Sequence, residues 1–232
     1  MMGRILKALG LAEYGGDELF IGSLACGAVA AVIYLQVTPY AAPLALLPWL
    51  LLVWFFRDPE RRLPDAPEAM ISPADGRVFD IEEVDGPPYM GGRALRIGIF
   101  LSPLDVHINR VPCEGVVQHV HHQTGEFLPA YNPKAPDRNE SVELGLLTAE
   151  GLKVLVKQIT GVLARRIVCK AQLGARLDRG ARYGMIKFGS RTEIYVPLTA
   201  GYRIAVKVGE RVRGGETILL TREGHAPAKE GV

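Results

Sequence analysis

The chain has 232 residues and a formal net charge of +2, from 27 Lys and Arg against 25 Asp and Glu. This length suffices for one domain with a hydrophobic core, or for a modest domain and a membrane segment. The charge is too small, and the basic residues too dispersed, for a nucleic-acid-binding protein. Cys26, Cys113 and Cys169 lie far apart and form no CxxC motif. This pattern indicates a reducing compartment without disulfides or structural zinc.

Two apolar runs lie near the N-terminus, Leu19–Leu35 and Ala41–Phe56. Each has about 16 residues, close to the lower limit of about 17 for a helix that crosses a membrane. Acidic residues precede the first run and no small-residue cleavage site follows it, so a cleaved signal peptide is not expected. The two runs predict a helical hairpin that turns at Pro39 and Tyr40. A buried hairpin of a soluble protein is the alternative.

Basic residues flank the predicted hairpin on both sides, with Arg57, Arg61 and Arg62 directly after it. The positive-inside rule then places both ends in the cytoplasm, so we expect the protein at the cytoplasmic face of the cell membrane. These arginines could also attract an anionic membrane surface. Whether the hairpin spans the bilayer or dips into one leaflet is left open. We assign residues 1–62 to this membrane-associating part and residues 63–232 to a second domain.

From about Ile71 onward, short stretches rich in Val and Ile alternate with Gly, Pro and Asp turns. This spacing is typical of a mostly antiparallel β domain. Helical periodicity is nearly absent, so helices beyond the hairpin should be few and short. The expected strands are Gly76–Ile81, Leu95–Leu101, Gly115–His121, Val142–Leu147, Val154–Thr160, Ile167–Lys170, Arg191–Val196, Arg203–Val206 and Thr217–Leu220.

A faint internal repeat runs through this domain. The segments Ser72–Val78, Val208–Ile218, Thr160–Ala164 and Leu173–Gly180 all place glycine-containing turns around short strands. Such pairs resemble the halves of the hammerhead barrel found in lipoyl and biotinyl carrier domains. We therefore predict a mostly β fold, with two interleaved hammerhead-like units in one barrel-sandwich domain. The lysine motifs that carriers modify, Met-Lys-Met or Asp-Lys, do not occur in this chain.

The most informative dipeptide is Gly189-Ser190, within Arg182–Arg191. Gly-Ser is only a turn in most proteins, and the Gly-x-Ser-x-Gly pattern of a hydrolase is absent. A serine hydroxyl can, however, attack the carbonyl carbon of its own preceding residue. Glycine at that position leaves the approach open and tolerates unusual backbone angles. β-Elimination of the resulting ester and loss of ammonia would convert the serine into a pyruvoyl group, whose ketone is an electrophile that ordinary side chains lack.

Four motifs occur in this chain in a fixed order: Phe55–Pro59 (FFRDP), Ser72–Gly76 (SPADG), Leu101–Pro112 (LSPLDVHINRVP) and Lys187–Arg191 (KFGSR). Together they resemble the short bacterial and archaeal branch of the phosphatidylserine decarboxylase family, from about Phe55 to Leu220. The resemblance implies self-cleavage between residues 189 and 190, into a large chain of residues 1–189 and a small chain of residues 190–232. The serine would become a covalent pyruvoyl cofactor.

The resemblance also implies a reaction and a partner. The substrate would be phosphatidylserine in the membrane, decarboxylated through a Schiff base to phosphatidylethanolamine and CO2. No metal and no nucleic acid is expected to take part. The lipid backbone, the preferred acyl chains and the oligomeric state are left open, with a homodimer as one option.

In this family an Asp and a His activate the serine for self-cleavage, by the logic of a serine-hydrolase triad. Asp75 matches the family's Asp, and a solvated turn residue is its alternative role. His107 matches a His in an Asp-x-His segment. Longer family members carry a second His where this chain has Arg110, and arginine cannot act as a general base. Either His107 serves both self-cleavage and proton delivery to the carbanion, or self-cleavage is activated differently here.

His119, His121 and His122 form the densest histidine cluster. On a strand, His119 and His121 would face the same way and could bind a metal. No third ligand is evident in the sequence, and the pyruvoyl mechanism needs no metal. A strand face near the pocket and a bystander role are the other interpretations.

Two rival functions stay open. One is a pyruvoyl enzyme that acts on a small soluble amino acid. The other is a membrane-anchored carrier or interaction domain of hammerhead type, which predicts an intact polypeptide.

Overall fold

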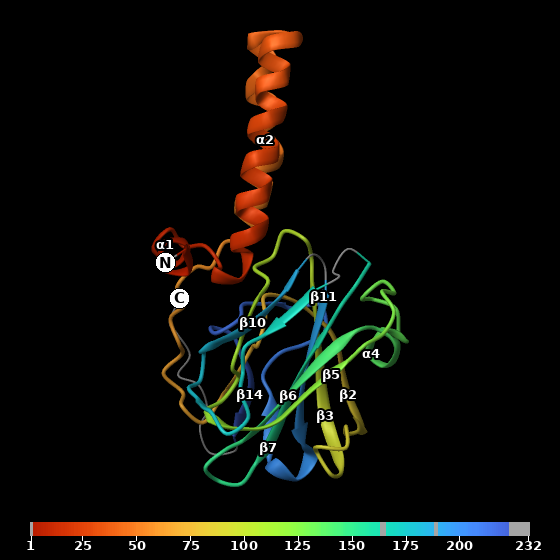
Figure 1. Cartoon of the computed structure of the whole chain (residues 1–232). Helices are drawn as coiled ribbons and strands as arrows, with labels where there is room; N and C mark the ends of the chain where they lie inside the picture. Colours follow the sequence, from red (N-terminus) through yellow and green to blue (C-terminus); the bar gives the residue numbers. More distant parts are fainter. Residues whose placement is uncertain (1, 163–165, 188–189, 223–232) are drawn as a thin grey trace, which may run out of the picture. The chain divides into compact units, whose positions relative to one another are not determined.

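The computed structural model describes residues 2–162, 166–187 and 190–222 (Figure 1). The chain divides into two compact units, residues 1–60 and residues 61–232. The first unit is helical, and the second contains all the described strands. The expected mostly β class with an N-terminal apolar helical hairpin is confirmed.

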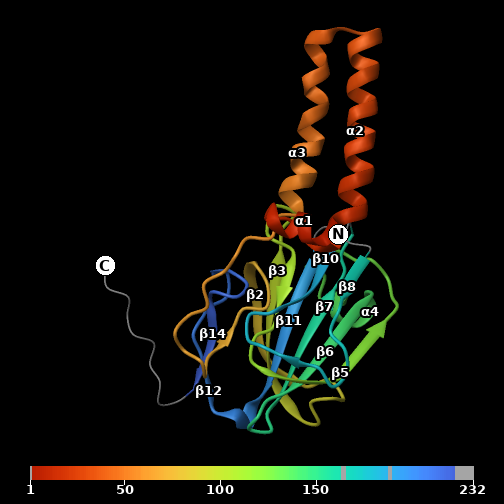
Figure 2. The same ribbon diagram turned by 60° about the vertical axis from the view of Figure 1, so that its left-hand side comes forward.

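The N-terminal unit contains two longer helices that lie side by side (Figure 2). The indole Nε1 of Trp49 donates a hydrogen bond of 3.0 Å to Ser23 Oγ between them. The second apolar run is less helical than expected, because Pro39 and Pro43 keep its start in a 3-10 conformation and the α-helix begins only at Leu46. The elements are α1 (Met2–Ala8), η1 (Glu13–Gly15), α2 (Gly16–Gln36), η2 (Pro39–Ala45) and α3 (Leu46–Phe55).

One stretch of this unit, Glu13–Gln36, is long and apolar enough to cross a membrane, whereas Pro39–Phe55 is shorter. Large apolar side chains along α2 are exposed, among them Phe20, Ile21 and Leu24. Exposure to water would cost about 25 cal/mol for each Å² of apolar surface. A lipid environment would remove that cost.

The β unit contains three antiparallel sheets. The largest has eight strands in the order β13-β2-β3-β11-β7-β6-β5-β9, and two smaller ones have the orders β1-β14-β12 and β4-β10-β8. One short helix, α4 (Ala135–Arg138), lies between β5 and β6. The strands are β1 (Met70–Ile71), β2 (Gly76–Asp85), β3 (Arg93–Leu101), β4 (Ile108–Arg110), β5 (Gly115–Gln123), β6 (Ser141–Leu147), β7 (Lys153–Ile159), β8 (Arg166–Cys169), β9 (Arg176–Leu177), β10 (Arg182–Lys187), β11 (Ser190–Pro197), β12 (Tyr202–Ile204), β13 (Arg211–Val212) and β14 (Ile218–Arg222).

The three sheets repeat one arrangement twice. The first half consists of β1, β2, β3 and β11 to β14, and the second half consists of β4 to β10. Each half joins a three-stranded sheet to a four-stranded block, β13-β2-β3-β11 or β9-β5-β6-β7, and the two blocks meet where β11 pairs with β7. The second half is inserted into the first, between β3 and β11. The predicted interleaving of two related units is confirmed.

Local details follow the same repeat. The segment 73–78 (PADGRV) leads into β2, and the segment 112–117 (PCEGVV) leads into β5. The amide of Gly209 donates to the carbonyl of Val78, at 2.7 Å, and the amide of Gly174 donates to that of Val117, at 2.8 Å. Both glycines have positive φ, which side chains rarely adopt. The repeat therefore extends to individual backbone hydrogen bonds.

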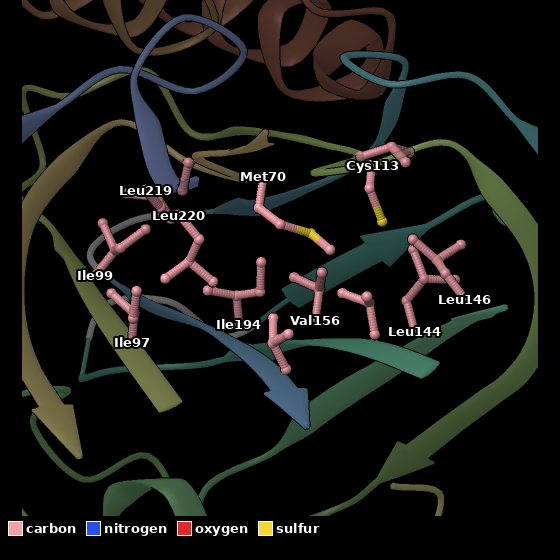
Figure 3. Packing of buried hydrophobic residues seen from close by; sticks show 14 of the residues in the cluster. Met70, Ile97, Ile99, Cys113, Leu144, Leu146, Val156, Ile194, Leu219 and Leu220 are labelled. Atoms are coloured by element: carbon pink, nitrogen blue, oxygen red, sulfur yellow. The ribbon is translucent and has the colours of Figure 1, made fainter. Parts of the chain in front are cut away.

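The hydrophobic core lies between the curled sheets and draws on both halves (Figure 3). Alternate residues of β7 and β11 point into it, namely Val154, Val156, Ile194 and Val196. Met70, the first residue of β1, packs into the same cluster. The figure shows side chains from strands far apart in sequence converging on one apolar interior.

All nine expected strands are present, with ends shifted by a few residues. Five strands were missed: β1, β4, β9 and β13, which have only two or three residues, and β10. The sequence of β10, RYGMIK, lacks clear alternation and contains Gly184. A Cβ at Gly184 would lie 2.1 Å from the carbonyl oxygen of Val168, so the close pairing of β10 with β8 requires glycine there.

Candidate active site

The chain passes between the two halves twice, once from β3 to β4 and once from β10 to β11. The two connections lie next to each other. Ser190, the first residue of β11, pairs with Leu101, the last residue of β3. The amide of Ile186 in β10 also donates to the carbonyl of His107, which precedes β4, at 3.3 Å. Two motifs that are more than 75 residues apart in sequence therefore meet at one end of the sheet.

Ser190 has no exposed surface. It lies on the same face of β11 as Thr192 and Ile194, which is the face turned to the core. Its Oγ has no hydrogen-bond partner among the described residues. A buried hydroxyl without a partner costs about 1–3 kcal/mol, so this position is unfavourable for a serine that serves packing alone. Gly189, the other member of the predicted cleavage site, lies outside the described residues.

His107 is also fully buried. Its Nδ1 lies 2.9 Å from the backbone carbonyl oxygen of Asp105. Because a carbonyl oxygen can only accept a hydrogen bond, Nδ1 carries the proton and Nε2 carries the lone pair in the neutral ring. This tautomer is the one that can take up a proton at Nε2.

Asp75 lies in the turn before β2, with both carboxylate oxygens engaged. Oδ2 accepts a hydrogen bond of 2.8 Å from Arg61, and Oδ1 accepts one of 2.8 Å from the amide of Gly214. Burial raises the pKa of Asp75, while Arg61 and the Gly214 amide act in the opposite direction and the nearby charge of Asp105 adds to the rise. Asp75 is thus a partly buried carboxylate with two hydrogen-bond donors rather than a solvated turn residue.

Two arginines of this region have roles that the sequence did not reveal. The side chain of Arg61 is only 9% exposed and bridges Asp75 and Glu216. The sequence places Arg61 among the cations that could attract a membrane surface, but in the structure its guanidinium forms ion pairs with Asp75 and Glu216. Arg110, at the position of the second family histidine, is buried and donates to the carbonyl of Gly180 at 3.1 Å.

A buried polar layer lies beside Ser190, formed by Asn109, Gln158 and Thr192, all with no exposed surface. Gln158 Nε2 donates to Asn109 Oδ1 at 2.8 Å, and Asn109 Nδ2 donates to Thr192 Oγ1 at 3.1 Å. These three residues were not predicted from the sequence, although the pattern of inward-facing residues indicates them. The inward positions of β7 change from Val156 to Gln158, just where those of β11 change from Ile194 to Thr192.

The opposite face of β11 carries buried charges. Arg191 and Glu193 are at most 2% exposed, and Arg191 Nη2 lies 2.6 Å from the Glu193 carboxylate and 2.7 Å from that of Asp80 in β2. Buried ions are tolerated only when they are paired, and removing one partner is strongly destabilising. This network fixes β11 against its neighbours immediately after Ser190.

The histidine cluster lies elsewhere. His119 and His121 do share a face of β5, with ring centroids 6.0 Å apart. His119 contacts Glu143 at 3.2 Å and His122 contacts Glu140 at 2.9 Å. Two strands, β6 and β7, separate β5 from β11 in the sheet. Within the described residues, no group of three or more His, Cys, Asp or Glu side chains is arranged to hold a metal ion.

Comparison with known proteins assigns this arrangement to a family. The family model described as Phosphatidylserine decarboxylase matches residues 50–220, which include every site residue discussed above. The chain belongs to the phosphatidylserine decarboxylase family. The matched segment also covers all fourteen strands except the last two residues of β14.

Individual members of the phosphatidylserine decarboxylase family align over most of the chain. The phosphatidylserine decarboxylase proenzyme of Symbiobacterium thermophilum is 45% identical over 201 residues, covering 86% of this chain and 91% of the relative. That of Salinibacter ruber is 48% identical over 180 residues, covering 77% of each. That of Rhodopirellula baltica is 40% identical over 215 residues, covering 92% of this chain and 88% of the relative.

We expect Arg61→Gln to raise the pKa of Asp75 further, because it removes a positive charge and a hydrogen bond that favour the carboxylate. Carbon NMR of labelled Asp carboxyl groups, in a Ser190→Ala chain that stays intact, measures this. Arg213→Gln is the matched control, since Arg213 contacts Glu216 at 3.6 Å with its side chain largely exposed. An Asp75 pKa unchanged by Arg61→Gln would contradict the prediction.

Proposed function

We propose that this chain is the precursor of a phosphatidylserine decarboxylase that cleaves itself between Gly189 and Ser190 and converts Ser190 into a pyruvoyl group. Membership of the family supports the reaction, and the name proenzyme carried by its relatives supports processing. The observation that carries the proposal is the buried Ser190 hydroxyl without a partner among the described residues, at the connection between the two halves.

Self-cleavage would begin when Ser190 Oγ forms a bond to the carbonyl carbon of Gly189. The bond from that carbon to the Ser190 nitrogen breaks, the nitrogen takes up a proton, and an ester remains. Removal of the Cα proton of residue 190 then expels the Gly189 carboxylate, which keeps the serine oxygen. The dehydroalanine that remains takes up a proton at its CH2 carbon and becomes an imine with a methyl group. Water then adds to the imine carbon and ammonia leaves, so that residue 190 ends as a ketone. No external oxidant or reductant is needed.

His107 is our candidate for the proton transfers. With its proton on Nδ1, the ring can take the Ser190 hydroxyl proton at Nε2 and deliver it to the departing nitrogen. We assign Asp75 to the same machinery as a partly buried carboxylate whose negative charge would stabilise the positive charge that develops on His107 during the proton transfer. Arg110 cannot replace the second family histidine as a base. His107 would therefore serve both self-cleavage and decarboxylation.

The surroundings of Ser190 fit a small polar prosthetic group, because the buried layer of Asn109, Gln158 and Thr192 offers hydrogen-bonding groups in an otherwise apolar interior. A pyruvoyl ketone there would supply an electrophile for the head-group amine and an electron sink for loss of CO2. His107 Nε2 would then deliver a proton to the head-group carbon that has lost CO2.

We further propose that the apolar helices attach the enzyme to the cell membrane, with the β unit on the cytoplasmic side. The length and composition of Glu13–Gln36 support attachment. The basic residues on both sides of the hairpin support the cytoplasmic location. Attachment would raise the encounter rate with a lipid substrate without any added contact to the head group.

Intact-mass spectrometry of the purified protein tests self-cleavage. We expect two chains, residues 1–189 and 190–232, with the small chain lighter by one ammonia than a peptide that starts with serine. A Ser190→Ala variant should remain a single chain, because it lacks the attacking oxygen. One full-length species in both samples would refute the processing step and favour a non-enzymatic hammerhead domain.

His107→Gln should slow self-cleavage by about 100-fold to 10,000-fold, the usual contribution of a general acid–base group. The fraction of cleaved chain over time, measured by gel electrophoresis, gives the rate. His121→Gln serves as the control, since His121 is exposed and lies on β5. Equal rates in the two variants would remove His107 from the mechanism.

The processed protein should release CO2 from phosphatidylserine in mixed detergent micelles, and at most slowly from free serine. The physical reason is that an enzyme attached to a membrane meets its substrate at the lipid surface. Labelled CO2 release measures both reactions, with Ser190→Ala as the blank. Faster release from free serine would instead indicate a pyruvoyl enzyme for a soluble amino acid.

A further inference from the structure

The polar layer beside Ser190 lies in a place that the fold would otherwise fill with apolar side chains. Going toward this end of β7, the inward residues are Val154, Val156 and then Gln158. A glutamine with no exposed surface costs free energy unless its amide is fully hydrogen-bonded. The hydrogen bonds of this residue therefore show whether it has a purpose beyond packing.

The side-chain amide of Gln158 makes only part of the hydrogen bonds that it could make. Its Nε2 donates to Asn109 Oδ1 at 2.8 Å. Asn109 in turn donates to Thr192 Oγ1, which identifies the Asn109 oxygen as the acceptor for Gln158. Gln158 Oε1, however, is buried and has no partner among the described residues. The second hydrogen on Nε2 makes no hydrogen bond to any of the described residues.

Beside this layer, Ser190 Oγ is a second buried side-chain oxygen that has no partner among the described residues. Gln158 is directly opposite Thr192 in the β7–β11 ladder, and Ser190 is two residues before Thr192 on the same face. Ser190 and Gln158 are therefore diagonal neighbours on adjacent antiparallel strands. Such neighbours have Cα atoms about 7–8 Å apart, which a side chain as long as glutamine can bridge.

We propose that Gln158 is the hydrogen-bond partner of residue 190 in both of its chemical states, an inference that rests on the proposed function. As a serine, residue 190 has a hydroxyl that can donate to Gln158 Oε1, which would hold its lone pairs toward the preceding carbonyl. As a ketone, residue 190 can only accept a hydrogen bond. Gln158 Nε2 can donate one to it while its other hydrogen remains hydrogen-bonded to Asn109 Oδ1. A primary amide combines both capacities in a neutral side chain.

This role explains why the layer contains an amide rather than a carboxylate or a hydrocarbon. An ionised carboxylate could accept from the serine but could not donate to the ketone. A hydrocarbon of the same length could do neither. Asn109 positions the Gln158 amide by accepting its hydrogen bond, and Thr192 in turn accepts a hydrogen bond from Asn109.

The test compares Gln158→Met, which keeps the length of the side chain but removes its hydrogen bonds, with Ser141→Ala. Ser141 in β6 is buried and its Oγ also has no partner among the described residues, but it pairs with Ile159 and so lies on the opposite face of the sheet from Gln158. Two rates are measured: self-cleavage by intact mass, and reaction of the processed ketone with phenylhydrazine. We expect Gln158→Met to slow each about 10-fold to 100-fold, as for the loss of one buried hydrogen bond to the reacting group. Ser141→Ala should stay within about threefold of the parent.

A third variant, Gln158→Glu, keeps the inference testable if Gln158→Met does not fold. A protonated carboxyl group can both donate and accept, whereas its ionised form can only accept. Relative to the parent at each pH, the ketone of Gln158→Glu should react faster with phenylhydrazine at low pH than at high pH. A flat ratio would overturn the inference.

Equal rates in Gln158→Met and Ser141→Ala would also overturn it, because the Gln158 amide would then have no specific role in either reaction. Neither result would contradict the proposed function. That proposal fails if the unsubstituted chain stays whole, if its small chain keeps the serine nitrogen, or if free serine is decarboxylated faster than phosphatidylserine.

Discussion

The pairing of β11 with β3 on one side and with β7 on the other is the constraint on which this structure depends. Strand β11 joins the four-stranded blocks of the two halves. In the chain it is the first strand that follows the inserted half. The ladder places Ser190 against Leu101 and turns its side chain toward the core. A shift of one residue would send the hydroxyl to the outer face and bring Arg191 inward.

Both faces of β11 oppose such a shift. On the inner face, Ile194 and Val196 are buried in the common core. On the outer face, Arg191 and Glu193 are paired with each other, and Arg191 also reaches Asp80. Breaking a buried ion pair costs about 3–5 kcal/mol, so any register that separates these charges is strongly disfavoured. The register of β11, and with it the position of Ser190, is thus held both by the apolar core and by charges on the face that does not carry the serine.

The electrostatics at this end of the sheet depart from a simple serine triad. The Asp75 carboxylate contacts a guanidinium and a backbone amide, while His107 is oriented by a backbone carbonyl. The position of a second histidine in longer family members holds Arg110, whose charge is directed to the carbonyl of Gly180. Activation of Ser190 would therefore rest on a single imidazole and on the buried polar layer beside it.

The amino-acid sequence alone determined the features that local patterns encode. Val- and Ile-rich stretches between turn residues located nine of the fourteen described strands, two apolar runs located the hairpin, and short motifs indicated the family and Ser190. It did not reveal β10, because a strand held by close pairing at Gly184 needs no alternating pattern. Only the tertiary structure showed that Arg61 pairs with Asp75 and that Asn109, Gln158 and Thr192 form one layer. These contacts join residues up to 83 positions apart, and such pairings depend on how the two halves interleave rather than on any local preference.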